Sequence, residues 1–217
     1  MSTVGLIITA AGNSTRFESD KSKQFYQIDG EVLLIKTLKA FFSTPYISEA
    51  IITMKKDNIE ELEIHLNSMS IPFKLTVIEG GSTRKESVEI AFNALSKCNR
   101  VMIHDGARPY VSEDLISRLL EKSKDKNAVI PGLKETDTVK KIENGKVVET
   151  LDRDAVYRIQ TPQVFSYNTL KDAYNNRYQE EITDESMLIE KLGTEVYVVA
   201  GDILNRKITT LNDLILS

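Results

Sequence analysis

The fold is decided near the start of the chain, by the stretch VGLIITAA at residues 4–11 and the stretch GNSTR at residues 12–16. Eight apolar or small residues in a row are typical of a buried strand. The glycine and the polar residues that follow end this strand in a loop. The chain therefore opens with a buried strand followed by a turn of small and polar residues.

The rest of the chain continues as an alternation of short apolar runs and amphipathic segments. Leu34, Leu38 and Phe41, for example, recur at helical spacing. Repeated strand–helix–strand units form a parallel sheet with helices on both faces, because right-handed crossovers place the helices there. We predict one α/β domain over residues 1–217, with a Rossmann-like, mostly parallel sheet. Strands are expected at residues 4–11, 50–54, 73–78, 101–103, 128–131 and 195–199, and helices at 33–42, 58–67, 87–95, 113–121, 170–178, 184–192 and 211–216.

Residues 138–150 break this alternation and have the pattern of a β-hairpin. Two alternating segments, 138–143 and 146–150, flank Asn144-Gly145, a pair that favours a type I′ turn. A two-stranded ribbon is marginally stable alone in water, so it needs a surface to pack on. Either the hairpin packs on its own domain, or residues 137–157 form a protruding arm that reaches a second subunit.

The composition excludes several classes of protein. The 217 residues include 28 Lys or Arg and 32 Asp or Glu, a formal net charge of −4, whereas proteins that track nucleic-acid phosphates usually carry a basic excess. One cysteine, Cys98, excludes an intrachain disulfide, and two histidines exclude a histidine-rich metal centre. No apolar run approaches the ~20 residues of a membrane span, and the N-terminus lacks the pattern of a signal peptide. We expect a cytoplasmic protein without nucleic-acid or membrane partners.

A small anionic ligand needs only a local cluster of cations, and such clusters follow the predicted strands. Ligands on parallel sheets bind at the carboxyl ends of the strands. The first cluster is the turn Ala10-Ala11-Gly12, with Arg16 and Lys23 beyond it. Backbone N–H groups of a small-residue turn can approach a phosphate closely, and the two cations would add full charges. Tight packing and solvated charge are the alternative interpretation.

The next strand ends in Gly80-Gly81, with Arg84 and Ser87 at the start of the following helix. A glycine pair permits unusual dihedral angles and leaves room for a planar ring. Ser82 or Thr83 could serve there merely as the N-cap of the helix. Capping accounts for the hydroxyl groups but not for both glycines.

A third strand ends in His104-Asp105-Gly106-Ala107-Arg108. Asp105 could hold a magnesium ion or a sugar hydroxyl at this position, or it could form a local ion pair with Arg108. His104 is expected to be a packed neighbour. Later candidates are single residues in loops and helix starts: Thr138 and Arg153 beside the hairpin, Thr161 in an extended turn, Thr183 near a helix N-cap, and Lys207 in a cationic loop.

Taken together and in this order, these segments resemble the 2-C-methyl-D-erythritol 4-phosphate cytidylyltransferase family from about Leu6 to Leu214. Each motif alone is weak, but six in register are specific. The resemblance implies a nucleotidyltransferase that uses CTP and makes 4-diphosphocytidyl-2-C-methyl-D-erythritol and pyrophosphate in the non-mevalonate isoprenoid pathway. Ribitol-phosphate cytidylyltransferases share most of these signatures, so ribitol 5-phosphate or another polyol phosphate is the alternative acceptor. A non-catalytic nucleotide-binding module is a more remote alternative.

The resemblance also implies roles for single residues, a divalent cation such as Mg²⁺, and a homodimer. In the family, the swapped arm carries Thr138 and Arg153 to the acceptor phosphate of the other subunit, and Asp105 lies near ribose and metal. The implied catalytic residues are Arg16, Lys23, Lys207 and Arg153. The implied nucleotide-binding residues are Ala10, Ala11, Gly12, Gly80, Gly81, Arg84, Ser87 and Asp105, and the implied acceptor-binding residues are Arg108, Thr138, Arg153, Thr161 and Thr183.

Three positions depart from the family pattern without deleting a charge. Ser14 replaces the second glycine of the first loop, Ser22 replaces the proline before Lys23, and Gly106 replaces an alanine. The serine at position 22 is expected to loosen the approach of Lys23.

The implied reaction is attack of an acceptor phosphate oxygen on the α-phosphorus of CTP. A phosphomonoester has its second pKa near ~6, so the nucleophile is already ionised and needs no general base.

Overall fold

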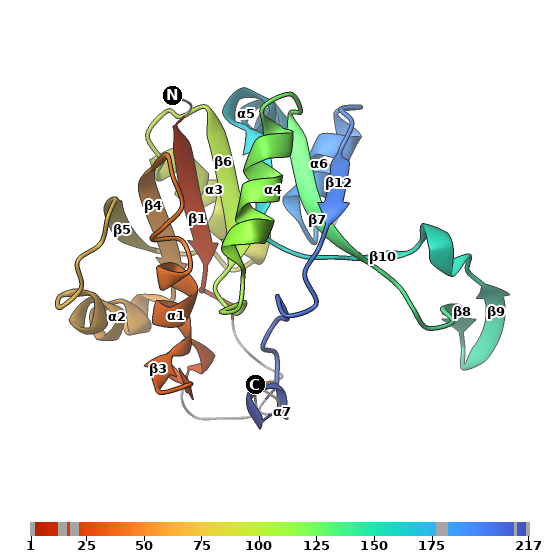
Figure 1. The fold of residues 1–217 in the computed structure, drawn as a ribbon, viewed down its shortest axis with the longest axis horizontal. Coiled ribbons are helices and arrows are strands. Elements are labelled where there is room, and N and C mark those ends of the chain that lie inside the picture. Colours follow the sequence, from red (N-terminus) through yellow and green to blue (C-terminus); the bar gives the residue numbers. More distant parts are fainter. Residues whose placement is uncertain (1–2, 13–16, 18–21, 177–181, 211, 216–217) are drawn as a thin grey trace.

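An eight-stranded sheet forms the centre of the computed structural model, which describes residues 3–12, 17, 22–176, 182–210 and 212–215 (Figure 1). Along the sheet the strands follow the order β10-β7-β11-β6-β1-β4-β5, and β12 also pairs with β7. The bounds are β1 Val4–Thr9, β4 Ile47–Met54, β5 Lys74–Glu79, β6 Arg100–Asp105, β7 Ala128–Lys134, β10 Tyr157–Ile159, β11 Gln163–Ser166 and β12 Tyr197–Ala200.

Most pairings in this sheet are parallel, as predicted. β1 runs parallel to both β4 and β6, β4 to β5, and β7 to β12. Two short strands that the sequence analysis missed, β10 and β11, run antiparallel to their neighbours. Residues 161–163 were expected to be only an extended turn. In the structure Gln163 begins β11, which lies between β6 and β7.

Helices cover both faces of the sheet, which confirms the predicted layers. Their bounds are α1 Leu33–Lys39, α2 Ile59–Leu66, α3 Arg84–Ala94, α4 Glu113–Ser123, α5 Tyr167–Asn175, α6 Glu185–Lys191 and α7 Asn212–Ile215. Several end earlier than predicted; the helix expected to reach residue 42 ends at Lys39. Short 3-10 helices span Lys23–Phe25 (η2), Lys56–Asn58 (η3) and Arg153–Ala155 (η4), and a small hairpin pairs β2 Gln27–Ile28 with β3 Glu31–Val32.

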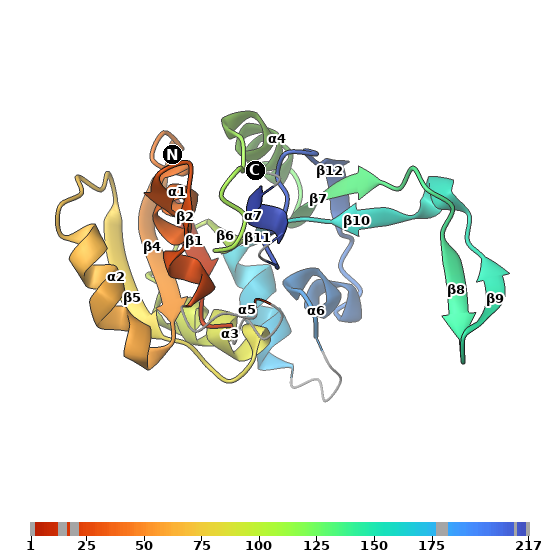
Figure 2. The same ribbon diagram turned by 90° about the horizontal axis from the view of Figure 1, so that it is seen from below.

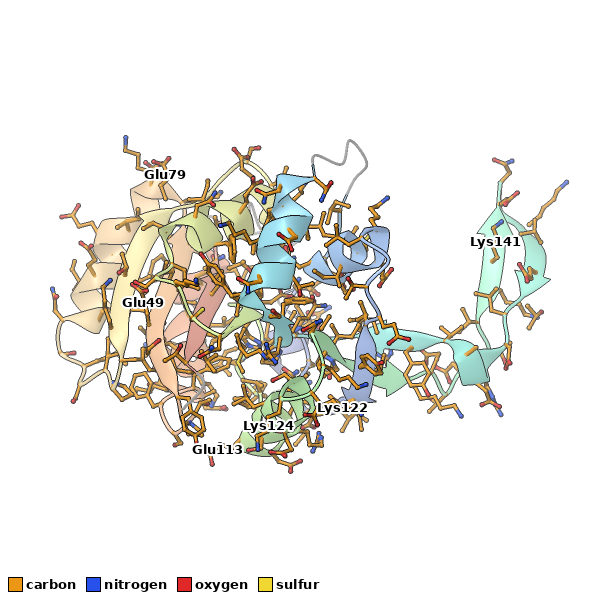
Figure 3. All side chains as sticks on the ribbon, turned by 90° about the horizontal axis from the view of Figure 1, so that it is seen from above. Glu49, Glu79, Glu113, Lys122, Lys124 and Lys141 are labelled. Atoms are coloured by element: carbon orange, nitrogen blue, oxygen red, sulfur yellow. The ribbon has the colours of Figure 1, made fainter. Side chains whose placement is uncertain are left out.

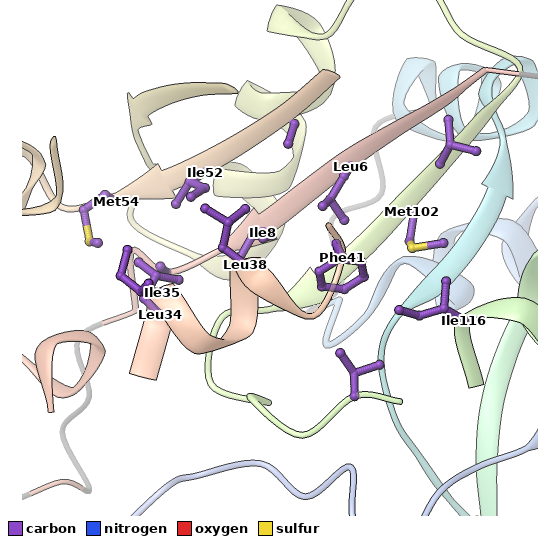
Figure 4. Close-up of a cluster of buried hydrophobic side chains, with 14 of the residues drawn as sticks. Leu6, Ile8, Leu34, Ile35, Leu38, Phe41, Ile52, Met54, Met102 and Ile116 are labelled. Carbon is purple, nitrogen blue, oxygen red and sulfur yellow. The ribbon is translucent and has the colours of Figure 1, made fainter. Parts of the chain in front are cut away.

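The core lies on the two sides of the sheet because successive side chains of a strand point to opposite faces. Leu6 and Ile8 of β1 pack with α1, α2 and α4, as Figure 4 shows for α1. Ile7, between them, packs on the other face with α3, α5 and α6. The described part of the chain contains no helix with the length and apolar character of a membrane span.

The hairpin stands away from the body of the molecule (Figures 1 and 2). β8 Lys140–Glu143 pairs antiparallel with β9 Lys146–Thr150, and Lys141 on β8 is labelled in Figure 3. Asn144 and Gly145 both have positive φ, 50° and 76°, as a type I′ turn requires. All residues from 140 to 150 are exposed, so the hairpin does not pack on its own domain.

Candidate active site

A pocket of about 280 Å³ opens at the carboxyl ends of β1, β5 and β6. This is the edge of the sheet where ligands are expected to bind. Its lining joins the small-residue turn after β1, the start of α3 and the loop before α7. Of the sequence-predicted residues, it contains Ala10, Ala11, Gly12, Lys23, Gly81, Arg84, Ser87, Asp105 and Lys207.

Gly80 and Gly81 are required by close approach of neighbouring atoms. A Cβ at Gly80 would lie 2.4 Å from the Cβ of Ala11, and one at Gly81 would lie 2.2 Å from Cγ of Glu86. The positive-φ glycines are elsewhere in the described chain, so the expectation of unusual dihedral angles at this pair is wrong. Ser87 is buried, and its hydroxyl accepts a hydrogen bond from the Gly81 N–H at 3.0 Å. Gly80 thus lets the turns after β1 and β5 pack tightly beside the pocket, and Gly81 leaves room for the side chain of Glu86.

The N-cap interpretation holds for Thr83, which precedes α3. Its hydroxyl oxygen accepts a hydrogen bond from the Glu86 N–H at 3.1 Å. This cap fixes the first turn of the helix, from which Arg84 extends into the pocket wall.

Lys23 lies in the short η2 helix and is only 9% exposed. Its ammonium donates a hydrogen bond to the carbonyl of Ile208 at 2.9 Å. Beside it, the Ser22 hydroxyl donates to Oε1 of Gln24 at 2.6 Å, and Nε2 of Gln24 donates to the carbonyl of Ala10 at 2.7 Å. Ser22 has φ −60°, close to the value that proline would impose. Ser22 therefore has a backbone conformation that proline could also adopt, and Lys23 lines the pocket beside the turn.

Asp105, at the end of β6, is surrounded by three cations. Its Oδ1 lies 3.2 Å from Nε of Arg84, and its Oδ2 lies 2.8 Å from Nζ of Lys207 and 3.6 Å from Nε of Arg108. Burial alone would raise the pKa of Asp105, but the charges of Arg84, Lys207 and Arg108 outweigh burial and hold the pKa well below its usual value. The local ion pair with Arg108 exists, but as the longest of the three contacts.

Lys207 owes its position to the backbone around it. The N–H of Ile208 donates to the carbonyl of Ala107 at 2.8 Å, which draws the loop toward the end of β6. Nη1 of Arg108 donates to the carbonyl of Asn205 at 2.8 Å, on the same loop. Residues more than 90 positions apart in sequence thus place an ammonium against the Asp105 carboxylate.

A second pocket, of about 360 Å³, shares Arg84, Asp105 and Lys207 with the first. Arg108, Thr161 and Thr183, the residues implied for the acceptor, line it together with Gln160, Gln163 and Asp184. The three shared charged side chains therefore form a wall between two adjoining pockets.

His104 is a packed neighbour, as expected. It is fully buried, its Nε2 lies 3.0 Å from the carbonyl of Arg108, and its Nδ1 lies 3.2 Å from the hydroxyl of Thr161. Since a carbonyl only accepts, Nε2 carries the proton and Nδ1 accepts from Thr161. Burial lowers the pKa of His104 to about 4. The imidazole is neutral and both of its nitrogens are engaged, so it is not available as a general base.

The sequence also predicts Arg16, Thr138 and Arg153 as site residues. Arg16 falls outside the described residues, as does Ser14. Thr138 and Arg153 belong to the arm, where Nη1 of Arg153 donates to the carbonyl of Thr136 at 3.3 Å. The arm stands away from the body (Figure 2), and neither residue lines either pocket of its own chain.

Glu185 is a residue that the sequence analysis missed as part of the site. The sequence predicts a helix N-cap near Thr183, and Asp184 does cap α6 by accepting from the Met187 N–H. Glu185, however, is fully buried, and its Oε2 lies 2.7 Å from Nη1 of Arg84. No local pattern in the sequence pairs residues 101 positions apart.

The donor set for a divalent cation is small. The described residues contain no group of three His, Cys, Asp or Glu side chains that could hold a metal. Asp105 is the acidic side chain that lines the first pocket, and its carboxyl is ionised. Mg²⁺ commonly takes one or two carboxylates together with substrate phosphates. A single carboxylate in the lining of the first pocket therefore fits a magnesium ion that would arrive with the phosphates of a nucleotide.

Comparison with known proteins yields one consistent result. The family model described as "IspD: 2-C-methyl-D-erythritol 4-phosphate cytidylyltransferase" matches residues 4–217. A curated relative named 2-C-methyl-D-erythritol 4-phosphate cytidylyltransferase, from Clostridium perfringens (strain SM101 / Type A), is 39% identical over 221 residues, which cover 100% of this chain and 98% of the relative.

Solved structures agree with the family model. A 4-diphosphocytidyl-2C-methyl-D-erythritol synthase from Anaerococcus prevotii DSM 20548 superposes with a TM-score of 0.87 at 32% identity, over 99% of this chain and 96% of that one. A 2-C-methyl-D-erythritol 4-phosphate cytidylyltransferase from Thermus thermophilus gives a TM-score of 0.79 at 32% identity, with the same coverage. The fold of this chain thus matches that of solved relatives over nearly its whole length.

Proposed function

Because the chain belongs to the 2-C-methyl-D-erythritol 4-phosphate cytidylyltransferase family, we propose that it transfers a cytidylyl group from CTP to 2-C-methyl-D-erythritol 4-phosphate. The products are 4-diphosphocytidyl-2-C-methyl-D-erythritol and pyrophosphate. Its relatives bear the name of this activity. The predicted compartment for the reaction is the cytoplasm.

The observation that carries this proposal is the pair of adjoining pockets. The first combines a small-residue turn, a helix start and Lys23, a combination suited to a nucleoside triphosphate. The second holds Arg108 beside two threonines, which suits a phosphate that carries hydroxyl groups. Arg84, Asp105 and Lys207 border both, so the two substrates would meet at this wall.

The proposed step is a displacement at the α-phosphorus of CTP. An oxygen of the acceptor phosphate forms a bond to that phosphorus, the bond from the α-phosphorus to the oxygen bridging to the β-phosphorus breaks, and pyrophosphate leaves with the electron pair. The acceptor phosphate has its second pKa near ~6, so it attacks as an anion at neutral pH and no proton has to be removed.

The side chains around the pockets suit such a base-free reaction. His104 is buried with both nitrogens engaged, and the low pKa of Asp105 makes it a poor proton acceptor. Without a general base, the protein has to hold two polyanions together and to stabilise the charge that develops at phosphorus. Lys23 and Lys207, which line the first pocket, and Arg108, which lines the second, would do this.

We also propose that a divalent cation, Mg²⁺, accompanies CTP and is held by Asp105 and the phosphates. When bound, the ion neutralises phosphate charge and polarises the phosphorus–oxygen bonds. The Asp105 carboxylate would then bind the metal ion while it also contacts Lys207 between the two pockets.

The arm suggests that the active unit is a homodimer with shared sites. Its exposed apolar side chains include Ile142 and Val147, which are 53% and 59% exposed, and a hairpin of this kind is only marginally stable without a surface to cover them. We propose that the arm packs on a second copy of the chain and brings Thr138 and Arg153 to the partner's second pocket. The acceptor phosphate would then meet cations from both subunits.

Side-by-side turnover of two acceptors tests the proposed activity. Purified protein with CTP and Mg²⁺ should release pyrophosphate with 2-C-methyl-D-erythritol 4-phosphate and much more slowly with ribitol 5-phosphate. ATP in place of CTP should give little turnover, because the room between the Ala10–Gly12 turn and the Gly80-Gly81 pair is expected to be too small for a purine. Absence of pyrophosphate release with both acceptors would contradict the proposal. Faster turnover of ribitol 5-phosphate would instead identify that compound as the acceptor.

A further inference from the structure

Glu185 is a buried carboxylate that stands behind the wall between the two pockets. It opens α6 and is 0% exposed, and neither pocket has it in its lining. Its neighbour Asp184 lines the second pocket and caps the helix. Any influence of Glu185 on bound substrates must therefore pass through a side chain that does reach them.

That side chain is Arg84. Its Nη1 lies 2.7 Å from Oε2 of Glu185, and its Nε lies 3.2 Å from Oδ1 of Asp105. A guanidinium is planar and carries its donors in a fixed fork, so two carboxylates at two of its nitrogens fix its orientation. Glu185, which lines neither pocket, contacts Arg84 at Nη1, and Asp105, which lines both, contacts it at Nε.

The burial of this pair is costly, which makes stability alone a poor explanation for it. Burying a charged carboxylate is unfavourable unless its pairing and hydrogen bonds are complete. Burial raises the pKa of Glu185 against the opposing attraction of Arg84. Within the described part of the chain, Oε1 of Glu185, Nη2 of Arg84 and the hydroxyl of the nearby Tyr174 are buried without a hydrogen-bond partner. Apolar side chains of similar volume would fill this space at lower cost.

Glu185 supplies a second carboxylate to a group of three cations at the wall between the pockets. Asp105 contacts Arg84, Arg108 and Lys207, so without Glu185 one carboxylate would pair with all three cations. Arg84 would then keep only its 3.2 Å contact with Asp105, and its Nη1 would have no carboxylate partner. With Glu185 in place, Arg84 is committed to the wall and the Asp105 carboxylate is held in one orientation between the pockets.

We propose that Glu185 is a positioning residue, which fixes Arg84 and through it orients the Asp105 carboxylate for the transfer. This inference rests on the proposed cytidylyl transfer. It assigns Glu185 no contact with either substrate.

The test is a double-mutant cycle of Glu185→Gln and Arg84→Ala in the full-length protein. Glu185→Gln keeps the volume but removes the charge that holds the guanidinium, so kcat should fall about 10- to 100-fold, while the KM values for both substrates change less. In the Arg84→Ala background the same substitution should change kcat by less than about twofold, because residues that act through one contact are not additive.

Glu49→Gln is the matched control for loss of a buried carboxylate. Glu49, labelled in Figure 3, is also buried. Its carboxylate pairs with Lys74 at 2.5 Å and accepts a hydrogen bond from the Ser96 N–H at 2.8 Å. It lies near the start of β4, at the opposite end of the sheet from the pockets. Its replacement should lower the melting temperature and leave kcat unchanged. If Glu185→Gln behaves in the same way, or if its loss of kcat adds fully to that of Arg84→Ala, the inference is wrong.

A second variant keeps the test informative if Glu185→Gln does not fold. Arg84→Lys retains the charge, but a single ammonium lacks the fork that contacts Asp105 and Glu185 together, so its kcat should fall by a similar factor. Full activity of Arg84→Lys would overturn the inference. If the unaltered protein transfers no cytidylyl group, the proposed function fails instead, and the two failures are distinguishable.

Discussion

Replacing Lys23 by alanine should lower kcat by about 10²- to 10³-fold, the loss typical when one preorganised donor to developing charge is removed. Lys23 is 9% exposed and lines the first pocket, so its ammonium acts where water is largely excluded and charge interactions are strong. Steady-state kinetics with CTP and 2-C-methyl-D-erythritol 4-phosphate measure the effect. The resemblance leads us to expect the same loss for Arg16→Ala.

The Lys23 variant needs a control for its structural contact. Its ammonium also binds the carbonyl of Ile208, so Lys23→Met, which keeps most of the aliphatic stem, should be compared with the alanine variant in melting temperature and in kcat. Lys36→Ala, which removes a lysine paired with Asp29 at 2.8 Å on the surface, should retain kcat. A loss below about threefold for both Lys23→Ala and Arg16→Ala would overturn the assignment of the triphosphate site, given the magnitude expected for such a donor.

Mixing two inactive variants should restore activity if the arm completes the partner's site. Arg153→Ala damages the arm, and Lys23→Ala damages the body. In a mixed dimer, the subunit with the intact body receives the intact arm, so one of its two sites is complete. With random assembly, about one quarter of all sites should be complete. Co-expression followed by an activity assay measures this recovery against each variant alone.

A mixture of Lys23→Ala with Lys207→Ala provides the matched control. Both lysines line the first pocket of the body, so no combination of these subunits yields a complete site and activity should stay at the level of the single variants. If the mixture of Lys23→Ala with Arg153→Ala shows no recovery although sedimentation shows mixed dimers, the site is not shared between subunits. A monomer in solution would reject the dimer itself.

The main features of the fold could be predicted because they depend on local patterns. Short apolar runs that alternate with amphipathic segments of helical spacing predict a parallel sheet with helices on both faces. Asn144-Gly145 predicts a type I′ turn, which the positive φ values of both residues confirm. β11 could not be predicted, since a four-residue strand in antiparallel pairing between β6 and β7 depends on contacts distant in sequence. The same reason explains the missed pairing of β10 with β7.

In the site, too, the features that depend on local sequence patterns could be predicted, and those that depend on contacts between residues distant in sequence could not. Residues at strand ends could be predicted to gather, and the structure brings Gly81, Lys23, Asp105 and Lys207 to one pocket. The wall between the pockets could not be foreseen, because it requires Arg84 to meet both Asp105 and Glu185. The need for glycine at position 80 was also misjudged, since it arises from the approach of Ala11, a contact between separate loops.

The central claim is that an acceptor phosphate oxygen attacks the α-phosphorus of CTP across the wall formed by Arg84, Asp105 and Lys207. The most direct measurement uses 2-C-methyl-D-erythritol 4-phosphate labelled with oxygen-18 in its phosphate, followed by mass analysis of both products. The account predicts that all of the label remains in 4-diphosphocytidyl-2-C-methyl-D-erythritol, including the oxygen that bridges the two phosphorus atoms, and that pyrophosphate is unlabelled. Label in the pyrophosphate, or no labelled diphosphate product at all, would contradict it.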